Sequence, residues 1–176
     1  DIIVFGMAGG RIDYCLPLIC MPHKFEYENH KTLFANFIGR RTHPVRDRVI
    51  HGLRDKQGCY ISEAKHDLSA YCSIIASSKY TIAPRGFSST SFRTMEALQY
   101  GSIPVIITDE LLSPHGINVE EYAVVIKEKD ADKVYEILKE KEIGATIMSE
   151  DYMKMYFRDL FTYDSNKKLI LEHLRK

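Results

Sequence analysis

The sequence has no excess of charge of either sign. Its 176 residues hold 24 Lys and Arg against 24 Asp and Glu, so the formal net charge is zero. No global field therefore draws the chain toward nucleic acid or an anionic membrane, and any anion site must be local. No apolar run approaches the length of a membrane span, and no N-x-S/T sequon occurs. We expect neither a nucleic-acid partner nor membrane contact from this segment.

Cysteine is scarce, and several enzyme signatures are missing. The cysteines have neither C-x-x-C spacing nor the density of a secreted scaffold, so we expect buried thiols, with one disulfide as the alternative. The histidines form no helical metal-binding pair with an acidic partner, no G-x-S-x-G elbow occurs, and no metal site is expected. The glycine cluster at residues 5–11 lacks G-x-G-x-x-G order, which favours a flexible turn over a dinucleotide site. The four cysteines are Cys15, Cys20, Cys59 and Cys72.

Short β-rich apolar runs alternate with amphipathic stretches. Apolar residues at i, i+3, i+4 and i+7 predict helices between the strands, and the alternation predicts an α/β fold with a mainly parallel sheet flanked by helices. After Gly144 the pattern is helical only, which predicts two extra terminal helices over 149–161 and 165–176. The predicted strands are 2–5, 32–39, 59–62, 79–83, 103–108 and 123–126. The predicted helices between them are 45–53, 67–76, 92–100 and 131–138.

Three residues predict helix ends. Asp67 and Asp130 stand where a carboxylate can cap free backbone N–H groups, and Gly101 is placed as a C-terminal stop. The D-A-D of residues 130–132 is similar to a metal-diphosphate motif, but its position at the start of a Lys- and Glu-rich helix favours capping.

The stretch PRGFSSTSFRTMEAL, residues 84–98, leaves a predicted strand and enters a predicted helix without a linker. Ligands of open parallel sheets bind in such loops. Gly86 permits unusual backbone conformations, and hydroxyls including that of Ser91 precede the free N–H groups of the helix, which suits a phosphate. Arg85 and Arg93 add positive charge that can hold a diphosphate. The alternative is a simple N-cap with solvent-exposed arginines.

Carboxylates at the same sheet edge are the second group of candidates. A capping box would need Ser or Thr at position 93, so we expect Glu96 to accept hydrogen bonds from the two hydroxyls of a ribose. A surface ion pair between Arg93 and Glu96 is the alternative. Asp109 and Glu110 follow the strand at 103–108 and could bind sugar hydroxyls, or form a simple turn.

Residues 40–56 hold the one local excess of positive charge, six basic residues against two acidic ones. Arg40 and Arg46 lie in this stretch and are candidates for an anion site. A solvated helix face is the plain alternative, and RNA binding with a steep salt dependence is a weaker one.

The order of these motifs resembles the exostosin-like glycosyltransferases, a GT47-type family. In that family a strand leads to P-x-G, then Ser-x-Arg, Glu-Ala and Gly-x-I/V-P-V, as residues 79–110 do here. Residues 31–50 resemble the family's F-x-G segment with a downstream Arg, and the likeness spans roughly residues 1–140.

The resemblance implies a Rossmann-like fold, the carboxyl-terminal half of a GT-B enzyme that transfers a sugar from UDP to a glycan acceptor with inversion and without a metal. By position, Arg93 and Ser91 would face the diphosphate, Glu96 the ribose, and Arg40 or Arg46 the phosphates. Residues 1–176 would then be one donor-binding domain of a longer two-domain enzyme, whose amino-terminal half carries the acceptor groove. No general base is assigned here. Xylose and glucuronic acid are the sugars that the family suggests.

Two other functions stay open: a catalytically silent nucleotide- or glycan-binding module, and a fucosyltransferase-like enzyme that uses GDP-fucose. Family members from eukaryotes often work in the Golgi lumen, whereas few cysteines and no sequons favour the cytoplasm, so the compartment also stays open.

Overall fold

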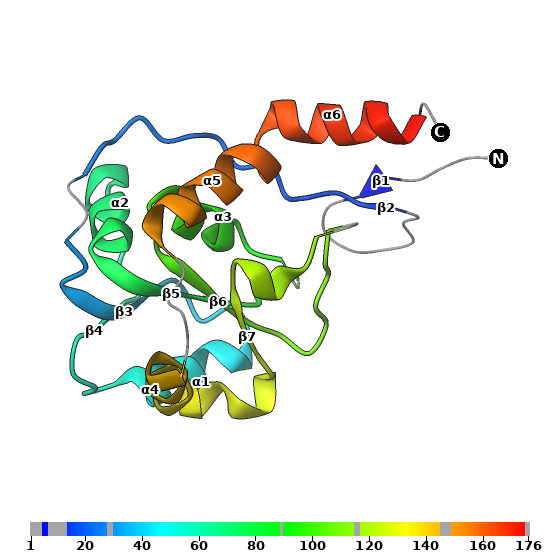
Figure 1. Ribbon diagram of the computed structural model, residues 1–176. Helices are drawn as coiled ribbons and strands as arrows, with labels where there is room; N and C mark the ends of the chain where they lie inside the picture. The colour runs from blue at the N-terminus through cyan, green and yellow to red at the C-terminus, as the bar shows by residue number, and fades with distance from the viewer. Residues whose placement is uncertain are drawn as a thin grey trace.

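A parallel sheet forms the centre of the chain, as the alternating pattern predicts. The computed structural model describes residues 5–6, 14–27, 30–88, 90–114, 117–144 and 149–174. Five strands lie in the order β4–β3–β5–β6–β7, all parallel to their neighbours (Figure 1). They are β3 (Leu33–Ile38), β4 (Cys59–Ser62), β5 (Ser78–Pro84), β6 (Ile103–Ile107) and β7 (Val124–Ile126).

The direction in which successive strands are added to the sheet reverses once. From β3 the chain moves outward to β4, returns past β3 to β5, and then continues to β6 and β7. The order therefore reverses between β3 and β5. In doubly wound sheets, ligands bind outside the carboxyl ends of the strands at such a switch point. The fold thus marks the loops that follow β3 and β5 as the place for a site.

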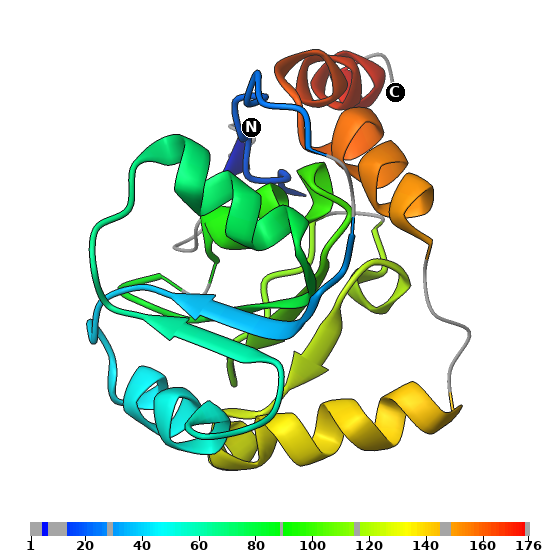
Figure 2. The same cartoon turned by 90° about the vertical axis from the view of Figure 1, so that its left-hand side faces the viewer.

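Helices cover both faces of the sheet (Figure 2). Helices α1 (Pro44–Leu53) and α4 (Val134–Gly144) lie on one face, and α2 (Leu68–Ala76) and α3 (Phe92–Gln99) on the other. In β6, Val105 packs in the α1 and α4 cluster, whereas Ile106 packs with α3. This alternation follows from the period of two in a strand, and it confirms the predicted α/β fold with helices on both sides.

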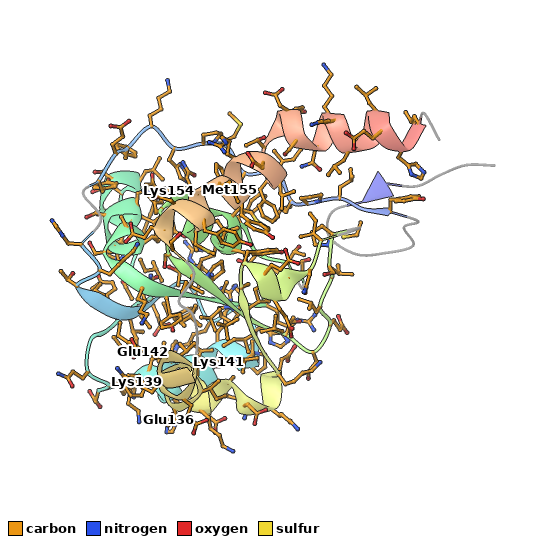
Figure 3. All side chains as sticks on the ribbon, in the orientation of Figure 1. Glu136, Lys139, Lys141, Glu142, Lys154 and Met155 are labelled. Carbon is orange, nitrogen blue, oxygen red and sulfur yellow. The ribbon has the colours of Figure 1, made fainter. Side chains whose placement is uncertain are left out.

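Helix α4 shows how one stripe meets the sheet while the rest faces water. Its Val134 and Leu138 are fully buried in the core. Its polar residues, labelled in Figure 3, include Glu136, which pairs with Lys56, and Lys139, whose Nζ lies 4.2 Å from the Phe34 ring centroid.

Helix ends match the prediction at two of three places. The Asp67 carboxylate accepts a hydrogen bond from the Ala70 N–H at 2.8 Å, and Gly101 has a φ of 63° after α3. The prediction for Asp130 is wrong, because a 3₁₀ turn, η2 (Glu128–Lys133), precedes α4. This turn packs against α1 at Gly52, where a Cβ would lie 2.4 Å from the Asp132 carbonyl oxygen.

The two terminal helices are present and differ in how they pack. In α5 (Glu150–Leu160), Met153 and Phe157 pack with Met95 of α3, whereas α6 (Tyr163–Leu174) buries only Asn166. Among the described residues, no helix is both long and apolar enough to cross a membrane.

The amino-terminal strand departs from the prediction. The described part, β1 (Phe5–Gly6), pairs in parallel with an unpredicted strand, β2 (Tyr14–Cys15), and this pair is separate from the main sheet (Figure 1). The rest of the predicted strand 2–5 and the glycine turn at 7–11 lie outside the described residues. A short 3₁₀ turn, η1 (Val119–Glu121), was also not predicted. The four cysteines are free thiols, of which Cys20 and Cys72 are buried.

Candidate functional site

A cleft opens at the switch point of the sheet. Its volume is about 680 Å³, and its walls are the loop after β3, the loop after β5 and the first turn and a half of α3. The loop after β4, Arg46 of α1, Tyr71 of α2 and Leu18 also line it. Of the predicted site residues, the cleft brings together six: Arg40, Arg46, Gly86, Ser91, Arg93 and Glu96.

Arg46 ties the two loops together. It rises from α1 with only 9% of its surface exposed, and its guanidinium donates three hydrogen bonds to backbone carbonyls. Nη1 bonds the Arg40 oxygen at 2.9 Å, Nε the Arg85 oxygen at 3.0 Å, and Nη2 the Pro84 oxygen at 3.4 Å. Three of its five donors are thus used to fix the loops, and two are left for a ligand.

Arg93 is held by packing more than by hydrogen bonds. Its guanidinium carbon lies 5.7 Å from the centre of the Phe37 ring, a cation–π distance. Its Nε and Nη1 are buried and have no hydrogen-bond partner in the described part of the chain. Buried donors without partners are costly, so their persistence at a cleft indicates a site for an acceptor from outside the chain.

Two glycines make room for the two guanidinium groups. A Cβ on Gly39 would lie 2.9 Å from Nη2 of Arg93, and a Cβ on Gly86 would lie 2.9 Å from Nη2 of Arg46. Neither glycine has a positive φ, so close approach is what requires them. The glycine of the F-x-G motif therefore leaves space for Arg93 at the switch point, and the glycine of the P-x-G motif leaves space for Arg46.

The positive charge of the cleft floor is not neutralised locally. Among the described residues, neither Arg46 nor Arg93 forms a salt bridge with a carboxylate. Burial lowers the pKa of Arg46, and the nearby charge of Arg93 lowers it further. Two mutually repelling cations with free donors are suited to an anion that carries more than one negative charge.

Glu96 lies farther along α3, and a neighbouring helix holds it. The Tyr71 hydroxyl donates a hydrogen bond to Glu96 Oε2. Glu96 Oε1 lies 3.9 Å from His23 Nε2, and the glutamate side chain is 19% exposed. Burial is the main cause that raises the pKa of Tyr71, the charge of Glu96 adds to it, and Arg93 acts in the opposite direction. Tyr71 thus stands between Arg93 and Glu96 and fixes the carboxylate.

The alternative of a surface ion pair is not formed: no salt bridge joins Arg93 and Glu96, both of which lie among the described residues. Ser91 is the N-cap of α3, and its hydroxyl accepts a hydrogen bond from the Arg93 N–H at 3.3 Å. The capping alternative is therefore correct for Ser91, although the residue also lines the cleft. Arg40 is exposed at the rim, with its carbonyl engaged by Arg46.

The other predicted residues lie outside the cleft lining. Arg85 pairs with Glu128 at 3.4 Å and with Glu110 at 3.5 Å. The Asp109 N–H donates to Glu128 Oε1, and the Glu128 N–H donates to Asp109 Oδ1, which closes a small ring between β6 and β7. This contact network engages Arg85, Asp109 and Glu110 within a turn in which one guanidinium lies among three carboxylates. A role in diphosphate binding for Arg85, and in sugar binding for Asp109 and Glu110, stays a prediction.

The remaining basic residues of 40–56 are largely engaged at the surface. Arg41 forms a bidentate pair with Glu63, at 2.8 and 2.9 Å, and a further bond to Asp47 at 2.7 Å. Arg48 pairs with Asp132 at 2.7 Å. The solvated-face alternative is therefore correct for much of this stretch, and Arg46 is the exception.

The sequence did not single out every residue of the cleft. Tyr71, and His23 next to Glu96 outside the cleft lining, were missed because nothing in a helical stripe or a loop marks a side chain that meets Glu96 from another element. Gly39 was within the quoted F-x-G segment, so its signal was present. Phe87 and Phe92 carried no signal, because exposed aromatics are not visible in a sequence.

Comparison with known proteins agrees with the motifs. A family model described as the exostosin GT47 domain matches residues 9–141. The chain is 32% identical over 82 residues to the Exostosin-1 homolog of Caenorhabditis elegans, a match that covers 46% of this chain and 22% of that protein. It is 26% identical over 129 residues to an Arabidopsis thaliana protein named "Probable glycosyltransferase", covering 72% of this chain and 26% of that protein. The chain thus spans about a quarter of the length of these relatives. The resemblance seen in the motifs is confirmed, and the chain belongs to the exostosin GT47 family.

Proposed function

We propose that the cleft binds the diphosphate of a nucleotide sugar and that this chain is the donor-binding part of a glycosyltransferase. The observation that carries the proposal is the pair of unneutralised guanidinium groups, Arg46 and Arg93, at the switch point. The N-terminus of α3 lies beside them, and its dipole also favours an anion. The two relatives named as an exostosin homolog and a glycosyltransferase support the same function.

The chemistry of transfer explains why such a pair is useful. When the glycosidic bond to the donor breaks, the departing diphosphate gains negative charge. Donors that are already fixed in place stabilise this charge without having to reorganise during the reaction. Arg46 meets that condition because three carbonyls hold its guanidinium. A reaction without a bound metal is the form that we propose, with the arginines taking the role of a cation.

The proposed ribose contact rests on Glu96, and the proposed nucleotide and sugar rest on family membership. Glu96 lies about one helical turn beyond Arg93, and we assign its carboxylate to the ribose hydroxyls. We propose UDP as the nucleotide, xylose or glucuronic acid as the sugar, and inversion at the transferred carbon, on the basis of family membership. A glycan acceptor would be held by an amino-terminal half, which would also supply the general base.

The binding part of the proposal is tested by calorimetric titration with UDP in the presence of EDTA. Wild type should bind, Arg93→Ala should lose binding, and Glu96→Ala should weaken it. Undiminished affinity of Arg93→Ala for UDP would remove the site assignment. Competition with GDP-fucose tests the nucleotide, and GDP-fucose should displace UDP poorly.

The catalytic part needs a separate measurement. A transfer assay on the longer chain that includes the amino-terminal half should give product from UDP-xylose or UDP-glucuronate. UDP binding without any transfer by that longer chain would instead identify a silent binding module.

A further inference from the structure

Two phenylalanines stand exposed at the arginine cleft. Phe87 has 93% of its surface exposed, and Phe92 has 55% exposed. Both line the cleft together with Arg46 and Arg93. Single exposed apolar residues are ordinary on a protein surface, but two aromatic rings in the wall of one cleft that also holds two arginines are a feature that a ligand can use.

The chain places each ring next to the anion-binding groups. Phe92 is the first residue of α3 and directly precedes Arg93, and Phe87 directly follows Gly86, which contacts Arg46. The rings and the two guanidinium groups therefore belong to the wall of the same cleft. The rings form the amino-terminal side of the cleft along α3.

Glu96 lies on the other side of Arg93. A helix rises 1.5 Å per residue, so Phe92 and Glu96 are about 6 Å apart along the axis of α3, with Arg93 between them. A nucleotide sugar has one ring system at each end of its diphosphate. With the diphosphate at the arginines and the ribose at Glu96, Phe87 and Phe92 are the exposed aromatic side chains of the cleft lining that remain for the sugar.

We propose that Phe87 and Phe92 form a platform against which the transferred pyranose of the donor packs. The inference rests on the proposed function and adds the residues that recognise the sugar. A pyranose presents a face of C–H groups, and an aromatic ring offers a large apolar surface for it at little conformational cost. The platform would favour sugars with an unbroken C–H face over the bare nucleotide.

The test compares the bare nucleotide with the nucleotide sugar. Calorimetry would measure the Kd of UDP, UDP-xylose and UDP-glucuronate for wild type, Phe87→Ala, Phe92→Ala and the double variant. Phe87→Ala should bind UDP within twofold of wild type but bind one of the sugar nucleotides about fivefold to tenfold more weakly, with a larger loss in the double variant. Phe87→Tyr keeps the ring and should restore the affinity.

The control is Tyr163→Ala, which removes an aromatic ring that is 72% exposed on α6, and it should change no Kd. The melting temperature of each variant checks the fold, and Phe87→Ala should keep it because its ring is exposed. Equal losses for UDP and for the sugar nucleotides, or no loss for either, would overturn the platform. Failure of wild type to bind UDP at all is a different result, which removes the proposed function and the platform with it.

Discussion

Arg93→Met should make the free protein more stable while it removes anion binding. The substitution keeps an apolar stem near the Phe37 ring but deletes the charge and the two buried donors, Nε and Nη1, that have no partner. A residue kept in spite of a cost to the fold is expected at a binding site, so the two effects together test the function of the cleft.

The magnitude follows from three contributions. Each buried donor without a partner costs about 1–3 kcal/mol, and the repulsion from Arg46 adds to this. Loss of the cation–π contact with Phe37 takes away about 1 kcal/mol. Since Arg93 is only half-buried, we use the low end of each range and expect a net gain of about 1 kcal/mol. That corresponds to a rise in Tm of about 2–4 °C for a chain of this size.

The effect of Arg93→Met on anion binding is unfavourable, and it is larger than the effect on stability. Two charge-assisted hydrogen bonds to a diphosphate contribute at least about 3 kcal/mol, so the Kd of pyrophosphate and of UDP should rise about 100-fold. Differential scanning fluorimetry without ligand measures the first effect, and calorimetry with pyrophosphate measures the second.

The matched control is Arg158→Met. The Arg158 side chain is 74% exposed on α5, where it pairs with its neighbour Asp159, so its loss should change neither Tm nor the Kd of pyrophosphate. A fall in Tm of Arg93→Met by several degrees together with an unchanged Kd would refute the reasoning, since Arg93 would then be a structural residue.

Two further predictions concern residues of the cleft, and a third concerns Lys31, which bonds the Ala76 and Tyr100 carbonyls away from it. Gly86→Ala should weaken pyrophosphate binding more than tenfold in calorimetry, because its Cβ would lie 2.9 Å from Arg46 Nη2 and displace the guanidinium; an unchanged Kd would contradict this steric role. Tyr71→Phe removes the hydrogen bond that holds Glu96, so it should weaken UDP several-fold and leave pyrophosphate, which has no ribose, unaffected. Burial lowers the pKa of Lys31 to about 8, whereas an unfolded lysine titrates near 10.4, so the unfolded state binds more protons between these values and the lysine's contribution to stability rises with pH. The Tm difference between wild type and Lys31→Met should therefore shift in favour of wild type from pH 8 to pH 10, and a shift the other way would contradict the lowered pKa.

The apolar periodicity and the motifs of the sequence were sufficient to predict the sheet and much of the cleft lining. Strands and helices repeat with periods that a sequence displays directly, so β3 to β7 and α1 to α3 lie where the apolar residues predict them. The start of α4 was misjudged because η2 packs on Gly52, a contact between segments that are distant in sequence.

The cleft shows the same difference between what the sequence predicts and what depends on contacts between distant segments. The sequence by itself determined the family and the α/β class, and it predicted the loop after β5 as the place for an anion, because hydroxyl and guanidinium groups there stand beside the free N–H groups at the start of a helix. Tertiary structure alone decided which arginines are left without a carboxylate partner among the described residues: Arg46 and Arg93 lie together in the cleft, while Arg85 pairs with Glu110 and Glu128 and Arg41 with Glu63. The charged residues can be read from the sequence. Whether each charge is neutralised depends on partners from distant elements, which only the fold brings within hydrogen-bonding distance.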